Sequence, residues 1–183
     1  MKVPLRFQIT EFDCGTVSLL NAFSYLYERE EIPPLLVKQI NKYTLDCYDD
    51  EGNLGAGGTS KEAIKKLTTW ISNYANSQSF NLNCQRLTGH DVCLESFLKC
   101  LNEGGVVFAR LWQTNEHYSI ITKINNGKAY IFDPYYLDKT YYNKDKDAKI
   151  VLNKPFSHNR IVSIKRLFSE TKKDFSLGPI EMR

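Results

Sequence analysis

The chain has 183 residues, of which 42% are hydrophobic and 25% charged, so a disordered or low-complexity protein is excluded. This length suits a single domain with a sizeable core. The 24 Lys and Arg residues against 21 Asp and Glu leave a net charge of only +3, and the basic residues are scattered, so nucleic acid is not expected as a partner.

The first hundred residues carry mostly helical periodicity. Asp13 precedes the first helical pattern as a candidate cap, and Thr59 and Glu62 have capping-box spacing ahead of a later one. We expect helices over 15–30, 35–43, 59–75 and 91–102, a loop rich in Asp and Gly over 46–58, and a strand over 80–87.

After Gly104-Gly105 the pattern changes from helices to strands rich in β-branched and aromatic residues. We expect strands over 106–112, 117–124, 128–132, 149–152 and 160–164, separated by turn residues. Helices followed by a meander of strands predict a single α+β domain with an antiparallel sheet. Its helical part covers about 1–104, its sheet part about 105–167, and an extended tail covers 168–183.

The five cysteines are odd in number and include no C-x-x-C pair, which argues against a disulfide framework and a zinc knuckle. His90 and Cys93 are the nearest approach to a ligand pair, but Cys93 also fits the buried stripe of a helix. We therefore expect no metal and no cofactor. No apolar run approaches the roughly 18 residues of a membrane span, and no signal peptide is visible, so we expect a cytoplasmic protein.

Cys14 lies at the expected start of the first helix, where the positive end of the helix dipole favours the nucleophilic thiolate. A lone cysteine in a helix is more often a core residue, so Cys14 needs a partner base. Of the three histidines, His117 has the best context, because it opens a strand after a polar loop. Asp133 closes the next strand and is the candidate group that orients His117.

The length of the hairpin loop decides whether His117 and Asp133 can meet. A two-residue turn at Asn126-Gly127 would place Asp133 opposite Ile120, on the face away from His117. A three-residue loop ending at Gly127 would place Asp133 opposite Ser119 instead, roughly 7 to 8 Å from His117 between backbones. The alternative is that Asp133 with the following proline merely forms a turn.

Gln8 precedes Cys14 by six positions. The oxyanion of an acyl-transfer intermediate needs preorganised donors. The side-chain amide of Gln8 and the backbone N–H of Cys14 are candidates for that role.

The pattern Gln8-x-x-x-x-Asp13-Cys14-Gly15, followed by His117-Tyr118 and Asp133-Pro134, resembles the bacteriocin-processing cysteine peptidases. These are papain-like domains that cleave leader peptides after a double glycine, usually at the N-terminus of an ABC transporter. The resemblance runs over about 3–135 and implies a helical lobe packed on an antiparallel sheet. It also implies that Cys14 is the nucleophile, His117 the general base and then acid, Asp133 its orienting group and Gln8 the oxyanion donor.

We therefore expect a stand-alone thiol-dependent peptidase that cleaves a short peptide or leader segment. A Gly-Gly preference, and a separate transporter or maturation partner that delivers the substrate, follow from the resemblance alone. Two alternatives stay open. The same thiol chemistry serves an acyltransferase, because an acyl-enzyme does not dictate its acceptor, and the chain would also suit a catalytically silent peptide-binding module.

Overall fold

Helices and strands are segregated along the chain in the computed structural model, which describes residues 1–183. The helices of the first part are α1 (Cys14–Leu26), α2 (Pro34–Tyr43), α3 (Lys61–Gln78) and α4 (Leu94–Asn102). The strands follow as β1 (Val107–Gln113), β2 (Asn115–Asn125), β3 (Lys128–Phe132), β4 (Ala148–Ile150) and β5 (Arg160–Ser163). A short helix, α5 (Ile164–Leu167), comes after the last strand, and 3₁₀ turns occupy Arg29–Glu31, Gly89–Asp91 and Ile180–Met182. The predicted α+β class is confirmed.

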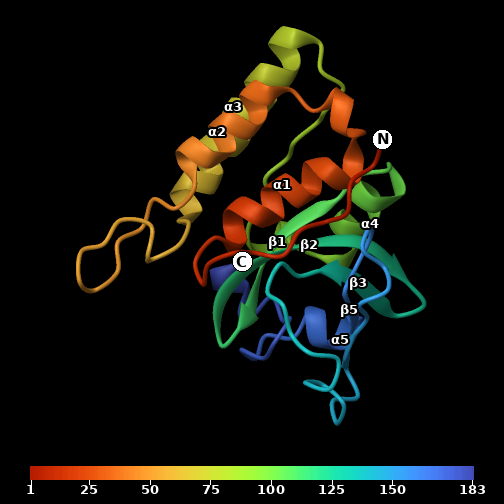
Figure 1. The fold of residues 1–183 in the computed structure, drawn as a ribbon. Helices are drawn as coiled ribbons and strands as arrows, with labels where there is room; N and C mark the ends of the chain where they lie inside the picture. Colours follow the sequence, from red (N-terminus) through yellow and green to blue (C-terminus); the bar gives the residue numbers. More distant parts are fainter.

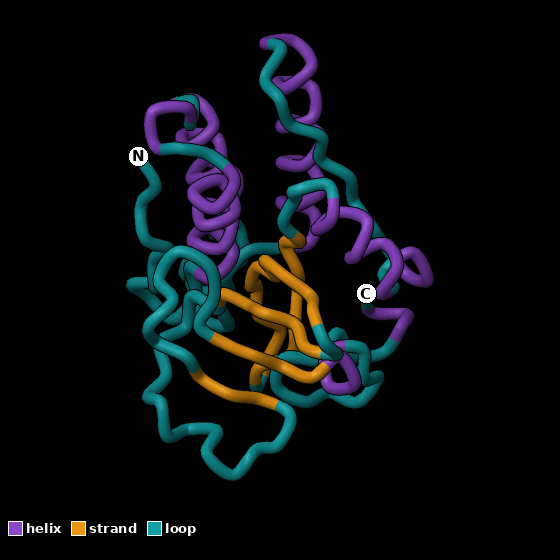
Figure 2. The backbone as a smooth tube through the Cα atoms, turned by 90° about the vertical axis from the view of Figure 1, so that its right-hand side faces the viewer, coloured by secondary structure: helices purple, strands orange, loops and turns teal.

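The five strands form one sheet in the order β1-β2-β3-β5-β4, and every neighbouring pair is antiparallel, as predicted. Figure 1 shows α1 lying across β1 and β2, with α2 and α3 beside it away from the sheet, and α5 on the other side of the sheet. Figure 2 shows the strands in the middle of the molecule, with most of the helices above them and shorter helical segments beside them near the C-terminus.

Three apolar cores stabilise this arrangement, and the smallest of them packs Ala22 of α1 against Ile120 and Phe132 of the sheet. The helical core joins α1, α2 and α3, and Leu36 and Ile40 of α2 are fully buried in it. The larger core lies against the sheet and includes the fully buried Ile121, Ile131 and Val162. Each fully buried aliphatic side chain contributes about 1.5–3 kcal/mol relative to an exposed one. The start of α1 lies where the helical part meets the sheet, so the core packing fixes its position.

Helix boundaries differ from the prediction where capping decides them. The first helix ends at Leu26 rather than near residue 30, and a separate 3₁₀ turn follows with a capping box between Glu28 and Glu31. The cap of α3 is Ser60, whose hydroxyl accepts from the backbone N–H of Ala63, and not Thr59.

The strand predicted over 80–87 is wrong, because this segment pairs with no other strand. Its apolar side chains Leu82 and Cys84 pack against the helical core instead. The carbonyl of Cys84 accepts from the Ser72 hydroxyl of α3. The apolar run therefore covers a helix and leaves the sheet at five strands.

The C-terminal residues are not an extended tail, because they pack along the outer edge of β1. Phe175 and Leu177 are buried in the larger core. The backbone N–H of Trp112 donates to the Ser176 carbonyl, and its own carbonyl accepts from the Phe175 N–H. A Cβ at Gly178 would overlap the Trp112 indole, so this segment lies directly against that side chain. The outer edge of β1 is covered at Trp112 as a result.

None of the helices combines the length and the apolar character that crossing a membrane requires.

Candidate active site

Three of the predicted site residues converge where α1 meets the sheet. Cys14 is the first residue of α1, His117 lies near the start of β2, and Asp133 follows β3 directly. Nε2 of His117 lies 2.7 Å from Oδ1 of Asp133, and both side chains are buried. The other ring nitrogen, Nδ1, is not engaged by Asp133, and the Cys14 side chain lies near enough to His117 to raise the pKa of the imidazole. The structure thus brings Cys14, His117 and Asp133 into one chain of contacts.

The charge of His117 is set by its two neighbours. Burial by itself lowers the pKa of His117, but the Asp133 carboxylate and the Cys14 side chain outweigh burial and raise this pKa to about 10. At neutral pH the imidazole ring is therefore protonated and lies beside the Cys14 side chain. A cysteine paired with an imidazolium in this way is an activated nucleophile.

The His117–Asp133 pair depends on a register that the hairpin reaches by an unexpected route. The turn has two residues, Asn126 and Gly127, both with positive φ, so the three-residue loop that would let the pair meet is not formed. The register nevertheless shifts by one position between Ile121 and Lys123, because Thr122 forms a β-bulge. Ile120 pairs with Phe132, and one step further along the strands Asp133 comes level with Ser119, as expected.

The bulge is fixed in place by side-chain hydrogen bonds. Thr122 is buried, and its hydroxyl donates to the Ser157 carbonyl at 2.9 Å. The Thr122 carbonyl accepts from the Tyr25 hydroxyl of α1 at 3.2 Å. The residue that sets the register of the site is therefore held by α1 and by the loop before β5.

Two residues that the sequence analysis missed, Asn159 and Arg160, hold Asp133 in place and form the supporting layer of the site. The side chain of Asn159 accepts from the Asp133 N–H at 2.8 Å and donates to the Asp133 carbonyl at 2.7 Å. Arg160 is fully buried, and its Nε lies 3.8 Å from Oδ2 of Asp133. The backbone N–H of Tyr135 also donates to Oδ1 at 2.9 Å. An arginine within a run of apolar strand residues is the one signal in the sequence that points to this layer.

The start of α1 has no side-chain cap, although Asp13 occupies the cap position. Its carboxylate instead accepts from the backbone N–H groups of Ile9 and Thr10, so Asp13 stands at the predicted cap position but does not cap the helix through its side chain. The first N–H groups of α1, beside Cys14, are therefore left without a side-chain acceptor.

Gly15 is required by close packing. A Cβ there would lie 2.9 Å from Cβ of Thr59 and 3.2 Å from the Tyr118 ring. Only glycine therefore allows α1 to approach the sheet and α3 this closely.

The structure places Gln8 beside the turn after Asp133. Its backbone N–H donates to the Pro134 carbonyl at 2.9 Å. Its side-chain Nε2 donates to the Thr10 carbonyl at 2.8 Å and keeps a second N–H, while Oε1 is buried without a partner. The Gln8 amide is thus held within the loop that leads to Cys14.

Tyr135, in the turn after β3, lies near both this loop and His117. The negative charge of Glu11 raises the pKa of the Tyr135 hydroxyl. The Tyr135 ring stands edge-on to His117, with 6.4 Å between ring centroids. Tyr135 therefore covers one side of the imidazole.

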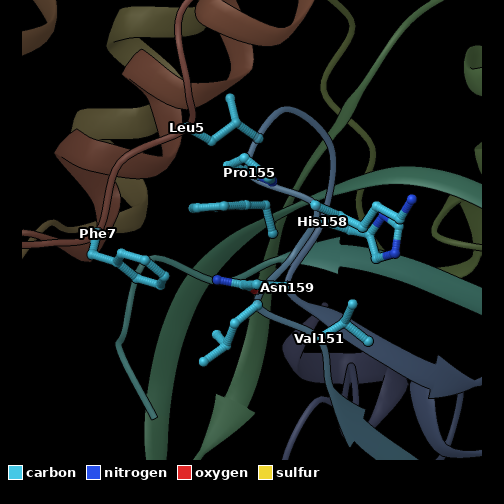
Figure 3. Close-up of a pocket in the computed structure, with 9 residues that line it drawn as sticks. Leu5, Phe7, Val151, Pro155, His158 and Asn159 are labelled. Carbon is cyan, nitrogen blue, oxygen red and sulfur yellow. The ribbon is translucent and has the colours of Figure 1, made fainter. Parts of the chain in front are cut away.

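Figure 3 shows a small pocket beside this supporting layer, between the N-terminal segment and the loop that leads into β5. Leu5, Phe7 and Pro155 line it with apolar atoms, and Asn159 forms part of its wall. Asn159, which holds the Asp133 backbone, therefore borders a small cavity whose walls are mostly apolar.

The other cysteines and histidines lie outside this constellation. All five cysteines are free thiols, and Cys14 is the one classed as buried. His90 and Cys93 belong to no group of three or more side chains suited to hold a metal ion. No family model, no curated protein and no solved structure matches the chain, so the site is interpreted from its own geometry.

Proposed function

We propose that the chain is a thiol-dependent peptidase with a papain-like fold, in which Cys14 is the nucleophile. One observation carries this proposal: a buried imidazole contacts Asp133 at 2.7 Å on one side and a cysteine at a helix N-terminus on the other. The arrangement of a cysteine-bearing helix against a sheet that carries the histidine and the aspartate supports the papain-like assignment. The motif around Gln8, Asp13 and Cys14 supports it independently.

The proposed reaction has two halves. The Cys14 thiolate attacks the carbonyl carbon of the scissile peptide bond and forms a tetrahedral intermediate. His117 then donates its proton to the leaving nitrogen, the C–N bond breaks, and the acyl group stays on sulfur as a thioester. In the second half His117 takes a proton from water, the hydroxide attacks the thioester, and Cys14 leaves as the thiolate with a free carboxylic acid as product.

The oxyanion of each intermediate needs donors near Cys14. The backbone N–H of Cys14 serves as the first, since no side chain caps the start of α1. The remaining N–H of the Gln8 amide is the second in this proposal. Removal of one such donor costs about 10²-fold to 10³-fold in turnover.

The proposed substrate is a short peptide or leader segment. Ile9 and Phe12, in the loop before Cys14, expose apolar side chains to solvent, and Ile9 is 93% exposed. An exposed apolar surface beside the nucleophile suits a peptide with apolar side chains near the scissile bond. Cleavage after Gly-Gly, and delivery by a separate transporter or maturation partner, are carried over from the resemblance.

Alkylation with iodoacetamide followed by mass spectrometry tests the nucleophile. Cys14 is the most buried of the five cysteines, so its selective labelling would report reactivity and not exposure. Cys14→Ala should remove this label and all turnover, whereas Cys47→Ala should change neither. Equal or slower labelling of Cys14 relative to the four half-buried cysteines would contradict the proposal.

Profiling of a peptide library that includes Gly-Gly sequences then tests the reaction. Free carboxylate products identify a peptidase, and amide products formed with an added amine identify an acyltransferase. Binding without either product identifies a silent peptide-binding module.

A further inference from the structure

Arg160 is a charged side chain with no access to solvent. It is the first residue of β5 and pairs with Ile131 of β3, two positions before Asp133. Because alternate strand residues share a face, Arg160 and Asp133 lie on the same face of the sheet. A buried cation is costly unless an anion and hydrogen-bond acceptors meet it.

The contacts of Arg160 all lead to the segment around Asp133. Its Nη2 donates to the Tyr135 carbonyl at 2.7 Å, and its Nη1 donates to the Asn159 carbonyl at 3.2 Å. Its Nε lies 3.8 Å from Oδ2 of Asp133, too far for a direct hydrogen bond. Oδ2 is buried and has no hydrogen-bond partner at all, so the nearby guanidinium charge is what stabilises it.

The Arg160 cation balances the charge of the buried side chains at the site. Asp133 is an anion, and the Cys14–His117 ion pair is neutral as a unit. Without Arg160 the buried cluster would carry one net negative charge, and Asp133 would be the buried anion without a permanent counter-ion. With Arg160 the four side chains sum to zero.

We propose that Arg160 is a positioning residue of the site, which holds Asp133 ionised and in place so that His117 and Cys14 form their ion pair. This inference rests on the proposed function for its catalytic meaning. The groups that face the cluster are His117 from β2, Cys14 from α1, and Tyr142 from the loop after β3, whose hydroxyl donates to Asp174. Of these groups only His117 can carry a positive charge, and that charge depends on pH. Arg160 is therefore the one permanent cation beside Asp133.

The test is the pH dependence of Cys14 alkylation in Arg160→Gln. Without the guanidinium Asp133 is harder to ionise and less firmly held, so it supports the His117 imidazolium less well, and the acid limb of the profile should move to higher pH by about one unit or more. Peptide turnover should fall about tenfold or more through kcat, with KM unchanged. Arg160→Lys, which keeps the charge, should leave the acid limb close to that of the wild type.

Arg166→Gln is the matched control. Arg166 is also largely buried and ion-paired, with Asp145 at 3.1 Å, but it does not contact Asp133. Its loss should lower the melting temperature without moving the alkylation profile. Equal profiles for Arg160→Gln, Arg166→Gln and the wild type would overturn the proposal and leave Arg160 a structural residue.

A double variant keeps the test usable if Arg160→Gln alone does not fold. Asp133→Asn with Arg160→Gln removes both charges and leaves no unpaired buried ion. Its alkylation profile should match that of Asp133→Asn alone, because Arg160 acts through Asp133. A further shift on adding Arg160→Gln would overturn the proposal. Failure of the proposed function itself appears already in the wild type, as a Cys14 profile no different from that of Cys84.

Discussion

The two sides of the candidate site differ in how they meet solvent. On the sheet side, Asp133, Asn159 and Arg160 are each at most 2% exposed. On the loop side, before Cys14, the Ile9 side chain is 93% exposed. The groups that set charge and orientation are thus enclosed, whereas the side chains within reach of a substrate are open.

The open side is nevertheless ordered in its backbone. The Asp13 carboxylate accepts from the N–H groups of Ile9 and Thr10, and the Gln8 N–H donates to the Pro134 carbonyl. The backbone of the loop before Cys14 is fixed by hydrogen bonds, while the Ile9 side chain stays free in solvent. Changes on the sheet side should therefore reduce both stability and chemistry, whereas changes on the loop side should affect only turnover or binding.

The largest effect is expected from Asp133→Asn on the sheet side. Turnover should fall about 10³-fold to 10⁴-fold, because His117 loses its orienting anion. The change also leaves Arg160 buried without a counter-ion, so unfolding in urea should occur at lower denaturant concentration. An unchanged urea midpoint would contradict the ion pair.

The same variant gives a prediction for pH. In the wild type the pKa of His117 is raised to about 10, so the stabilisation of folded protein by its charge is fully present below about pH 6.5 and is lost as the pH rises through about 10. Asp133→Asn lowers this pKa, so the variant should lose less stability than the wild type over that interval. Urea titrations at both ends of the interval measure the difference.

Gln8→Ala changes the loop side, and the loss of turnover should be smaller than for Asp133→Asn. Alkylation of Cys14 should stay nearly intact, because alkylation forms no oxyanion. Peptide turnover should fall about 100-fold. If both reactions slow equally, Gln8 supports the loop around Cys14 and is not an oxyanion donor.

Asn159→Leu tests whether the clamp on the Asp133 backbone matters. The N–H and carbonyl of Asp133 would lose their buried partners, so the free energy of unfolding should fall by about 2–4 kcal/mol. Turnover should fall about tenfold. The control is Asn41→Leu, which removes an exposed asparagine of α2 and should change stability by less than about 0.5 kcal/mol.

Ile9→Ser should have the smallest effect, and it separates binding on the loop side from stability most cleanly. Stability should stay within about 0.5 kcal/mol of the wild type, because the side chain is exposed. KM for an apolar peptide should rise about threefold with kcat unchanged, since apolar contact area is lost. Leu35→Ser, at an exposed position on α2, should leave KM unaltered.

The sequence was sufficient to predict the α+β class, the order of the main elements and the meeting of His117 with Asp133. The change of periodicity near Gly104 marks the border between helices and strands, and the β-branched runs mark the strands. Strand 80–87 could not be predicted correctly, because an apolar extended run packs equally well on a helix as on a sheet. Its partner is decided by tertiary contacts that periodicity does not encode.

The supporting layer was beyond sequence reasoning for a different reason. Asn159 and Arg160 are residue types that normally lie at the surface, and only the folded chain places them beneath Asp133. The bulge at Thr122 was equally hidden, because a bulge depends on contacts with Tyr25 and Ser157, which are distant in sequence. Local pattern predicted which residues meet but not what holds them.

The site depends on the number of residues between His117 and Asp133 being matched to the turn and to the Thr122 bulge. Sixteen positions separate His117 from Asp133, and a two-residue turn alone would put an even separation on opposite faces. One extra residue, whether in the strand or in the turn, corrects the parity. Homologues are therefore free to exchange a bulge for a longer turn, whereas an uncompensated insertion or deletion of one residue between these positions would disconnect the pair.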